Sequence, residues 1–124
     1  ASFTGAGFYK VDGGTRWQFR SSVTTTPTTT DLEYTAGGSG YVTLGIELIP
    51  FSSTEFWAIP WIDSAGGNNL IQCRAYGASP RTPSVKHRVT YSGTTALRYF
   101  VGVKAGGANS EVVNLDLAQF AKKR

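Results

Sequence analysis

Residues 84–91 read SVKHRVTY, and this stretch decides the fold class. Every second side chain is apolar or carries a ring: Val85, His87, Val89 and Tyr91. The residues between them are polar: Lys86, Arg88 and Thr90. Successive side chains of a β-strand point to opposite faces of the sheet, so this period of two predicts a half-buried strand. One face would meet a core, and the other would meet solvent or a partner.

The same alternation recurs in TRWQFRS (15–21), YVTLGIELIPF (41–51), LIQCRAY (70–76) and TALRYFVGVK (95–104). The side chains expected to face the core in these runs are Trp17, Phe19, Val42, Leu44, Ile46, Leu48, Ile71, Cys73, Ala75, Leu97, Tyr99, Val101 and Val103. Stretches rich in Gly, Pro, Ser and Asn separate the runs at intervals of about 8–12 residues, as in a sandwich or barrel. We therefore predict an all-β fold: a single antiparallel, jelly-roll-like β-sandwich domain over residues 1–124, with about 8–9 short strands.

Three segments depart from this pattern. EFWAIPWI (55–62) is apolar on both faces, and Pro60 cannot donate to a ladder, so an edge strand or a bulged strand is expected. TTTPTTT (24–30) is expected to form an exposed extended loop; the alternative is an arm that pairs with a neighbouring subunit. SEVVNLDLAQF (110–120) favours a strand; the alternative is a short C-terminal helix capped by Ser110.

Composition excludes several classes of protein. The chain has 124 residues, 40% of them apolar and 16% charged, which favours one folded domain over disorder. No apolar run approaches the ~18 residues of a membrane span, and no signal peptide opens the sequence, so we expect no membrane insertion. Cys73 is the single cysteine, so no internal disulfide can form. One histidine and one cysteine cannot complete a tetrahedral zinc site, so neither a metal nor a cofactor is expected.

Catalytic motifs are also missing. His87 shares its parity with Val85 and Val89, which predicts a buried neutral histidine rather than a general base. Ser39 lies in GGSGY, which lacks the second glycine of a nucleophile elbow. GAGFYK (5–10) begins like a dinucleotide-binding fingerprint but has Lys10 at the sixth position. We therefore expect no enzymatic activity.

Charge is segregated along the chain. Residues 64–110 carry six basic residues and no acidic one, although the whole chain has eight acidic residues. Five of these bases alternate with apolar neighbours and are predicted to share one sheet face, together with two aromatic residues: Arg74, Lys86, Arg88, Arg98, Lys104, Tyr76 and Phe100. Such a surface could bind nucleic acid, or the acidic part of an identical subunit. The alternative is an ordinary solvated face.

A second candidate surface is aromatic. Trp57 and Trp61 are four residues apart and therefore on one face of a strand, beside Phe56 and near the loop that holds Asn68 and Asn69. Spaced indole rings can stack on sugars, and the loop could supply polar groups. Core packing, or burial under a neighbouring subunit, is the alternative.

ASFT (1–4) and VDGGT (11–15) resemble the N-terminal hairpin of the small RNA-phage coat proteins. Those coats end in two helices, whereas residues 76–110 are rich in Gly, Pro, Ser and β-formers, so that coat fold is not extended to the rest of the chain. More broadly, TTTPTTT, the small-residue loops AGGSG, SAGGNN and AGGANS and the lack of disulfides resemble the β-sandwich proteins of virus and phage particles.

The resemblance implies a non-enzymatic structural protein of the virion, such as a capsid, decoration or tail surface component. Such a protein would self-assemble into a homo-oligomer or lattice. The alternatives are a carbohydrate-binding receptor module and a nucleic-acid-binding protein that uses the basic face; a cytoplasmic location is the alternative to the virion.

Overall fold

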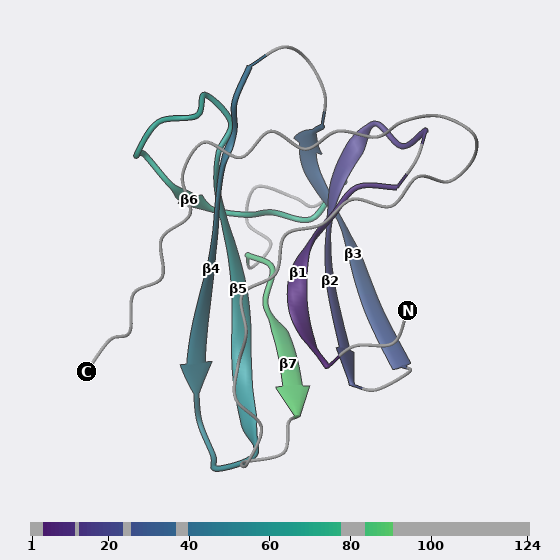
Figure 1. Ribbon diagram of the computed structural model, residues 1–124, viewed down its shortest axis with the longest axis vertical. Coiled ribbons are helices and arrows are strands. Elements are labelled where there is room, and N and C mark those ends of the chain that lie inside the picture. Colours follow the sequence, from purple (N-terminus) through teal and green to yellow (C-terminus); the bar gives the residue numbers. More distant parts are fainter. Residues whose placement is uncertain (1–3, 12, 24–25, 37–39, 78–83, 91–124) are drawn as a thin grey trace.

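The computed structural model of the chain describes residues 4–11, 13–23, 26–36, 40–77 and 84–90 (Figure 1). These residues form seven strands and no helix. The strands are β1 (Gly5–Tyr9), β2 (Arg16–Val23), β3 (Thr26–Thr35), β4 (Thr43–Pro50), β5 (Glu55–Asp63), β6 (Ile71–Gln72) and β7 (His87–Thr90). The predicted all-β, antiparallel class is confirmed. The predicted strand at 95–104 and the predicted strand or helix at 110–120 lie outside the described residues.

The first sheet has the order β1-β2-β3. Phe19 on β2 is fully buried and Trp17 packs against the core, as the alternation predicts. The loop prediction for TTTPTTT is wrong for residues 26–30, because they form the first half of β3. Pro27 pairs there with Ser22, on a strand at the edge of its sheet, where proline is tolerated.

The second sheet has β5 at its centre: β4 pairs along one side, and β6 and β7 pair along the other. The predicted edge position of residues 55–62 is therefore wrong. The face of β5 towards the core holds Phe56, Ala58 and Ile62, and the opposite face holds the half-buried Trp57 and Trp61, so both faces are apolar.

Pro60 is tolerated in this central strand because the neighbouring strand changes at its position. The Pro60 carbonyl accepts a hydrogen bond from the Cys73 N–H at 2.9 Å, so the proline nitrogen also faces Cys73. An ordinary residue would donate its N–H to the Cys73 carbonyl. The Val85 N–H donates to that carbonyl instead, at 3.0 Å, so the missing donor is replaced where β6 ends and the segment leading to β7 arrives.

The two sheets share one core and form a β-sandwich-like arrangement (Figure 1). The buried apolar residues of this core are Phe19, Leu32, Phe56, Ala58, Ile62, Cys73, Val85 and Val89. The inward positions predicted for residues 85, 87 and 89 are confirmed, because all three side chains are buried while Lys86 and Arg88 are exposed.

The segment after β6 joins the two sheets. Ala75 forms a bridge with Leu32 on β3, the Glu33 N–H donates to the Arg74 carbonyl, and the Tyr76 N–H donates to the Asp31 carbonyl. The chain therefore leaves the second sheet at Cys73 and pairs with the edge of the first.

The inward prediction fails at the edge of the second sheet. Val42 and Leu44 pack against the core, but Ile46 and Leu48 are 40% and 37% exposed, because the first sheet packs on β5 and β7 rather than over β4. Ile71 is also exposed, on the two-residue strand β6. None of the described residues forms a helix long and apolar enough to cross a membrane.

Candidate functional site

The outer face of the second sheet, which points away from the shared core, brings together side chains from both predicted surfaces. β5 and β7 lie side by side (Figure 1). In their register, Trp57 is paired directly with Arg88. Alternation places Trp61 on this face and Lys86 at its β7 side, while the core side of both strands holds the buried residues other than Ile59. One surface therefore holds the predicted basic residues Lys86 and Arg88 together with the predicted aromatic residues Trp57 and Trp61.

Rings and cations are in contact at one end of this face. The Lys86 ammonium lies 4.6 Å from the centre of the Trp57 ring, and the Arg88 guanidinium lies 4.7 Å from the centre of the Phe51 ring. The two rings are 5.6 Å apart and inclined at 34°. Both cation distances fall within the ~6 Å over which a ring attracts a positive charge.

Glu55 completes the group, which we call the cation–aromatic cluster: Phe51, Glu55, Trp57, Lys86 and Arg88. Arg88 binds Glu55 through two hydrogen bonds, Nε to Oε1 at 3.0 Å and Nη2 to Oε2 at 2.7 Å. The hydrogen bond from Arg88 lowers the pKa of the Glu55 carboxyl, and the same bond raises the pKa of Arg88. Lys86 has no acidic partner among the described residues.

Acidic residues reach this face from β4 and β5. Glu47 and Asp63 share the parity of Trp57 and Trp61 in the paired register, so both belong to the outer face. The absence of acids in residues 64–110 therefore does not produce an acid-free surface, because the neighbouring strands supply carboxylates. Sequence reasoning placed neither Phe51 nor Glu55 in the site, although continuing the alternation of residues 41–51 puts Phe51 on this face.

The remaining predicted basic residues divide between two locations. Arg74 and Tyr76 lie in the segment that pairs with β3, and the Arg16 guanidinium stacks 3.7 Å from the centre of the Tyr76 ring. They belong to the surroundings of the first sheet rather than to the cluster. Arg98, Phe100 and Lys104 lie outside the described residues.

Phe56 does not belong to a surface. It is 3% exposed and lies in the core opposite Val89, so it is unavailable to a partner or a sugar in this fold. Trp57 and Trp61 are half-buried, and Ile59 between them is 9% exposed. Phe56 and Ile59 are therefore buried, whereas Trp57 and Trp61 remain partly exposed on the outer face.

Asn68 and Asn69 lie in an exposed loop that is built around Asp63. The Asp63 carboxylate accepts hydrogen bonds from the Ala65 N–H and the Asn69 N–H, both at 3.0 Å. Gly66 has a φ of 74°, and a Cβ atom there would come within 2.7 Å of the Tyr41 carbonyl oxygen. These contacts give the loop a defined conformation, which requires glycine at position 66.

A buried histidine links the sheets. His87 Nδ1 lies 2.9 Å from the Ser21 hydroxyl and Nε2 lies 2.8 Å from the Thr30 hydroxyl. This pairing resembles a nucleophile and its base, but Ser21 is only 4% exposed and His87 only 7%. Burial also lowers the pKa of His87, which agrees with the predicted neutral histidine. A substrate has no access to this serine, so the contact acts as a polar link within the core.

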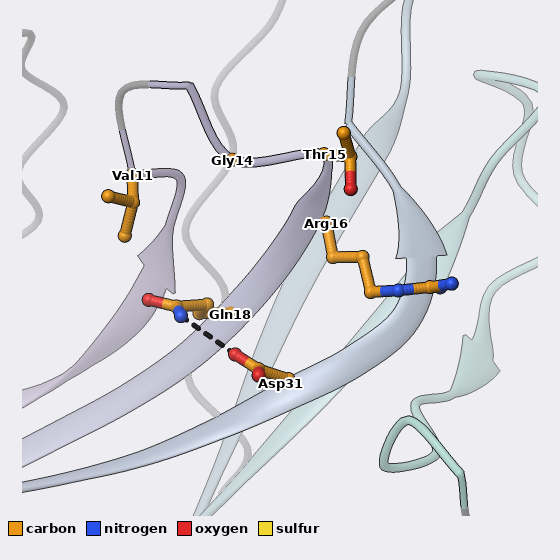
Figure 2. A pocket seen from close by; sticks show the side chains of 6 residues that line it. All are labelled: Val11, Gly14, Thr15, Arg16, Gln18 and Asp31. Carbon is orange, nitrogen blue, oxygen red and sulfur yellow. Dashed lines mark hydrogen bonds between the residues drawn. The ribbon is translucent and has the colours of Figure 1, made fainter.

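A shallow depression lies beside the turn between β1 and β2, with a volume of about 190 Å³ (Figure 2). Its lining residues are Val11, Gly14, Thr15, Arg16, Gln18 and Asp31. The Gln18 amide donates to the Asp31 carboxylate at 2.7 Å. The Arg16 guanidinium is bound to the Glu33 carbonyl and stacked on Tyr76. Gln18 and Asp31 are therefore bonded to each other and Arg16 is held by residues outside the depression, while the Gln18 Oε1 atom is buried without a hydrogen-bond partner.

Among the described residues, no group of three His, Cys, Asp or Glu side chains is placed to hold a metal ion. No protein-family model, curated protein or solved structure matches the chain.

Proposed function

We propose that the protein is a non-enzymatic structural protein of a virus particle, which assembles with copies of itself through the open edge of β4. The observation that carries the proposal is an eight-residue strand that, among the described residues, pairs on one side only. An unpaired edge presents a row of backbone donors and acceptors to any strand that approaches it.

The hydrogen bonds of β5 show which backbone groups of β4 point away from β5. Backbone groups of successive residues point to alternate sides of a strand, and those of Pro60 point to β6, so the odd-numbered residues of β5 bond towards β4. The hydrogen bond from the Phe51 N–H to the Glu55 carbonyl, at 3.2 Å, agrees with this assignment. The odd-numbered residues of β4 are their partners in the register. The backbone groups of Leu44, Ile46 and Leu48 are therefore directed to the open edge.

Devices that usually protect an edge are few on β4. Native edges are blunted by charged side chains, prolines, bulges or short length. This strand has one charged residue, Glu47, and its one proline, Pro50, stands at its last position. Ile46, Leu48 and Ile49 are each 37–42% exposed, which is unusual for three large apolar side chains so close together.

A second copy of the chain is the partner that fits this edge. Two antiparallel copies of one strand satisfy each other's backbone groups about a two-fold axis, because such a contact uses the same surface on both subunits. The exposed apolar side chains of β4 would be covered by the same pairing.

The virion location rests on the sequence resemblance, which involves the threonine tract and the small-residue loops. We include in the proposal a jelly-roll-like completion of the sandwich by strands beyond the seven described, at edges other than that of β4, supported by the alternation in residues 95–104 and the apolar pattern of 110–120.

The proposal is tested by the mass of the protein in solution, measured by light scattering over a range of concentrations. We expect an oligomer for the natural sequence. Leu48→Pro removes one outward N–H and repeats what Pro50 already does two residues later, so it should shift the mass towards one chain. Leu48→Thr is the matched control, since it keeps the N–H and loses only apolar surface. A single-chain mass for the natural protein, or an unchanged oligomer for Leu48→Pro, contradicts the proposal.

A further inference from the structure

We propose that the cation–aromatic cluster (Phe51, Glu55, Trp57, Lys86 and Arg88) binds single-stranded nucleic acid, independently of the assembly edge on β4. The cluster lies on the outer face of the second sheet, whereas the proposed assembly contact uses the edge of that sheet. Binding at the cluster therefore goes beyond the proposed structural function.

The cluster presents a ring surface to solvent. Phe51 is 43% exposed, and its ring is inclined at only 34° to the half-buried Trp57 ring 5.6 Å away. Flat rings of this kind stack on nucleobases without selecting a sequence, because every base has an aromatic face. A base needs to be unpaired for this contact, so the ring surface favours a single strand over a duplex.

Cations flank the rings on the β7 side. Lys86 lies over Trp57 and has no acidic partner among the described residues. Arg88 uses two of its five N–H groups on Glu55, and its side chain remains 56% exposed, so further N–H groups can reach a phosphate. A nucleotide combines a stacking base with an adjacent negative charge, and the cluster offers the complement of both.

Glu55 sets the direction of one decisive test. Its carboxylate holds Arg88 and repels a phosphate, so it competes with the ligand for the same guanidinium. Neutralising this carboxylate should therefore strengthen binding. A cluster that served only to hold β5 and β7 together would give no such gain.

A neutral sugar is the weaker ligand for this site, because it carries no charge and would leave the Lys86 and Arg88 cations without a function. An acidic protein surface would use the cations and leave the rings without a function. The combination of rings and cations therefore favours nucleic acid.

The experiment measures the anisotropy of a labelled single-stranded oligothymidylate with the full chain, between about 50 and 200 mM salt. We expect affinity to fall as salt rises, and Lys86→Ala to reduce the slope of log K against log salt by about 0.7, the value for one phosphate contact on a single strand. Phe51→Ala should weaken binding several-fold with little change in slope, and Glu55→Gln should strengthen it.

Arg20→Ala is the matched control, because Arg20 also stacks on a ring, that of Tyr9 at 4.2 Å, but on the first sheet. Its affinity should equal that of the natural protein. Four results would overturn the proposal: no binding to the oligonucleotide, unchanged affinity for both Lys86→Ala and Phe51→Ala, no gain in affinity for Glu55→Gln, or equal affinity for oligothymidylate and heparin, which has charge but no bases. Thermal melting of each variant confirms that the fold is retained.

Discussion

His87 on β7 and Ser21 on β2 are joined across the two sheets, with Nδ1 and the hydroxyl oxygen 2.9 Å apart. The Thr30 hydroxyl occupies the other ring nitrogen, and the Phe19 ring lies 5.0 Å from the imidazole. An unpaired polar group in such a position would cost free energy, so one sheet can pack on the other only where these partners meet. The pair therefore helps to fix how the sheets are aligned.

The histidine link predicts a loss of stability in mild acid. Burial lowers the pKa of His87 below its ordinary value of 6.5, so the unfolded chain takes up this proton more readily than the folded one. The contribution of His87 to the free energy of unfolding should be fully present above about pH 6.5 and should decline as the pH falls below that value. Urea denaturation at pH values above and below 6.5 measures this decline.

His87→Gln is the control for this measurement, because it keeps hydrogen-bonding capacity and does not titrate. Its stability should change less over the same pH interval. Glu55, whose pKa is lowered from 4.5, loses its contribution in stronger acid, so the two effects occupy separate pH ranges. Equal pH dependence of the variant and the natural protein above pH 4.5 would show that His87 is not responsible.

Cys73 should be inert in the folded protein. The thiol is fully buried, and burial raises its pKa to about 12, so little of the reactive thiolate is present near neutral pH. Labelling with a thiol reagent should occur only as fast as the protein unfolds, and should become rapid in denaturant. Fast labelling of the native protein would show that Cys73 is accessible.

The same shift predicts an alkaline effect on stability. The unfolded thiol ionises near its ordinary pKa of 9.0 while the folded thiol does not, so stability is retained below about pH 9 and declines as the pH rises towards 12. Cys73→Ala should remove this component, which unfolding curves at alkaline pH can measure.

Two glycines offer a matched test of the loop at residues 64–69. Gly66 and Gly13 have φ values of 74° and 71°, but a Cβ atom at Gly66 would lie 2.7 Å from the Tyr41 carbonyl oxygen, whereas one at Gly13 would meet nothing within 4 Å. Gly13→Ala should cost about 1–2 kcal/mol for the left-handed backbone alone. Gly66→Ala should cost more, by about 1–3 kcal/mol of added strain.

Chemical denaturation of the two alanine variants measures this difference. Equal losses of unfolding free energy would mean that the contact between Gly66 and the segment before β4 relaxes at no cost.

Alternation in the sequence was sufficient to predict the burial of a strand that has one face on the core and the other exposed. Residues 85–90 obey it because β7 has a buried face and an exposed face. It was insufficient for β5, because the strand's central position depends on partners that come from residues 43–50 and 87–90. Pro60 indicated an edge strand. A proline is tolerated in this central strand because the neighbouring strand changes at Pro60, where the Val85 N–H donates to the Cys73 carbonyl in its place.

The candidate site was predicted in part for the same reason. Trp57, Lys86 and Arg88 were identified from their own runs, but their contact requires the register of β5 with β7. Glu55 is 33 residues from Arg88 in the chain, so local charge counting missed the carboxylate that binds it.

The central claim, that the protein assembles through the open edge of β4, is tested most directly by hydrogen exchange at single amides of this strand. Exchange is measured below and above the concentration at which the protein assembles. The amides of Gly45 and Glu47 bond towards β5 and should be protected at every concentration. The amides of Leu44, Ile46 and Leu48 point to the open edge, so we expect them to be protected only in the assembled protein. Rapid exchange of these three amides in the assembly, or their protection in the single chain, would contradict it.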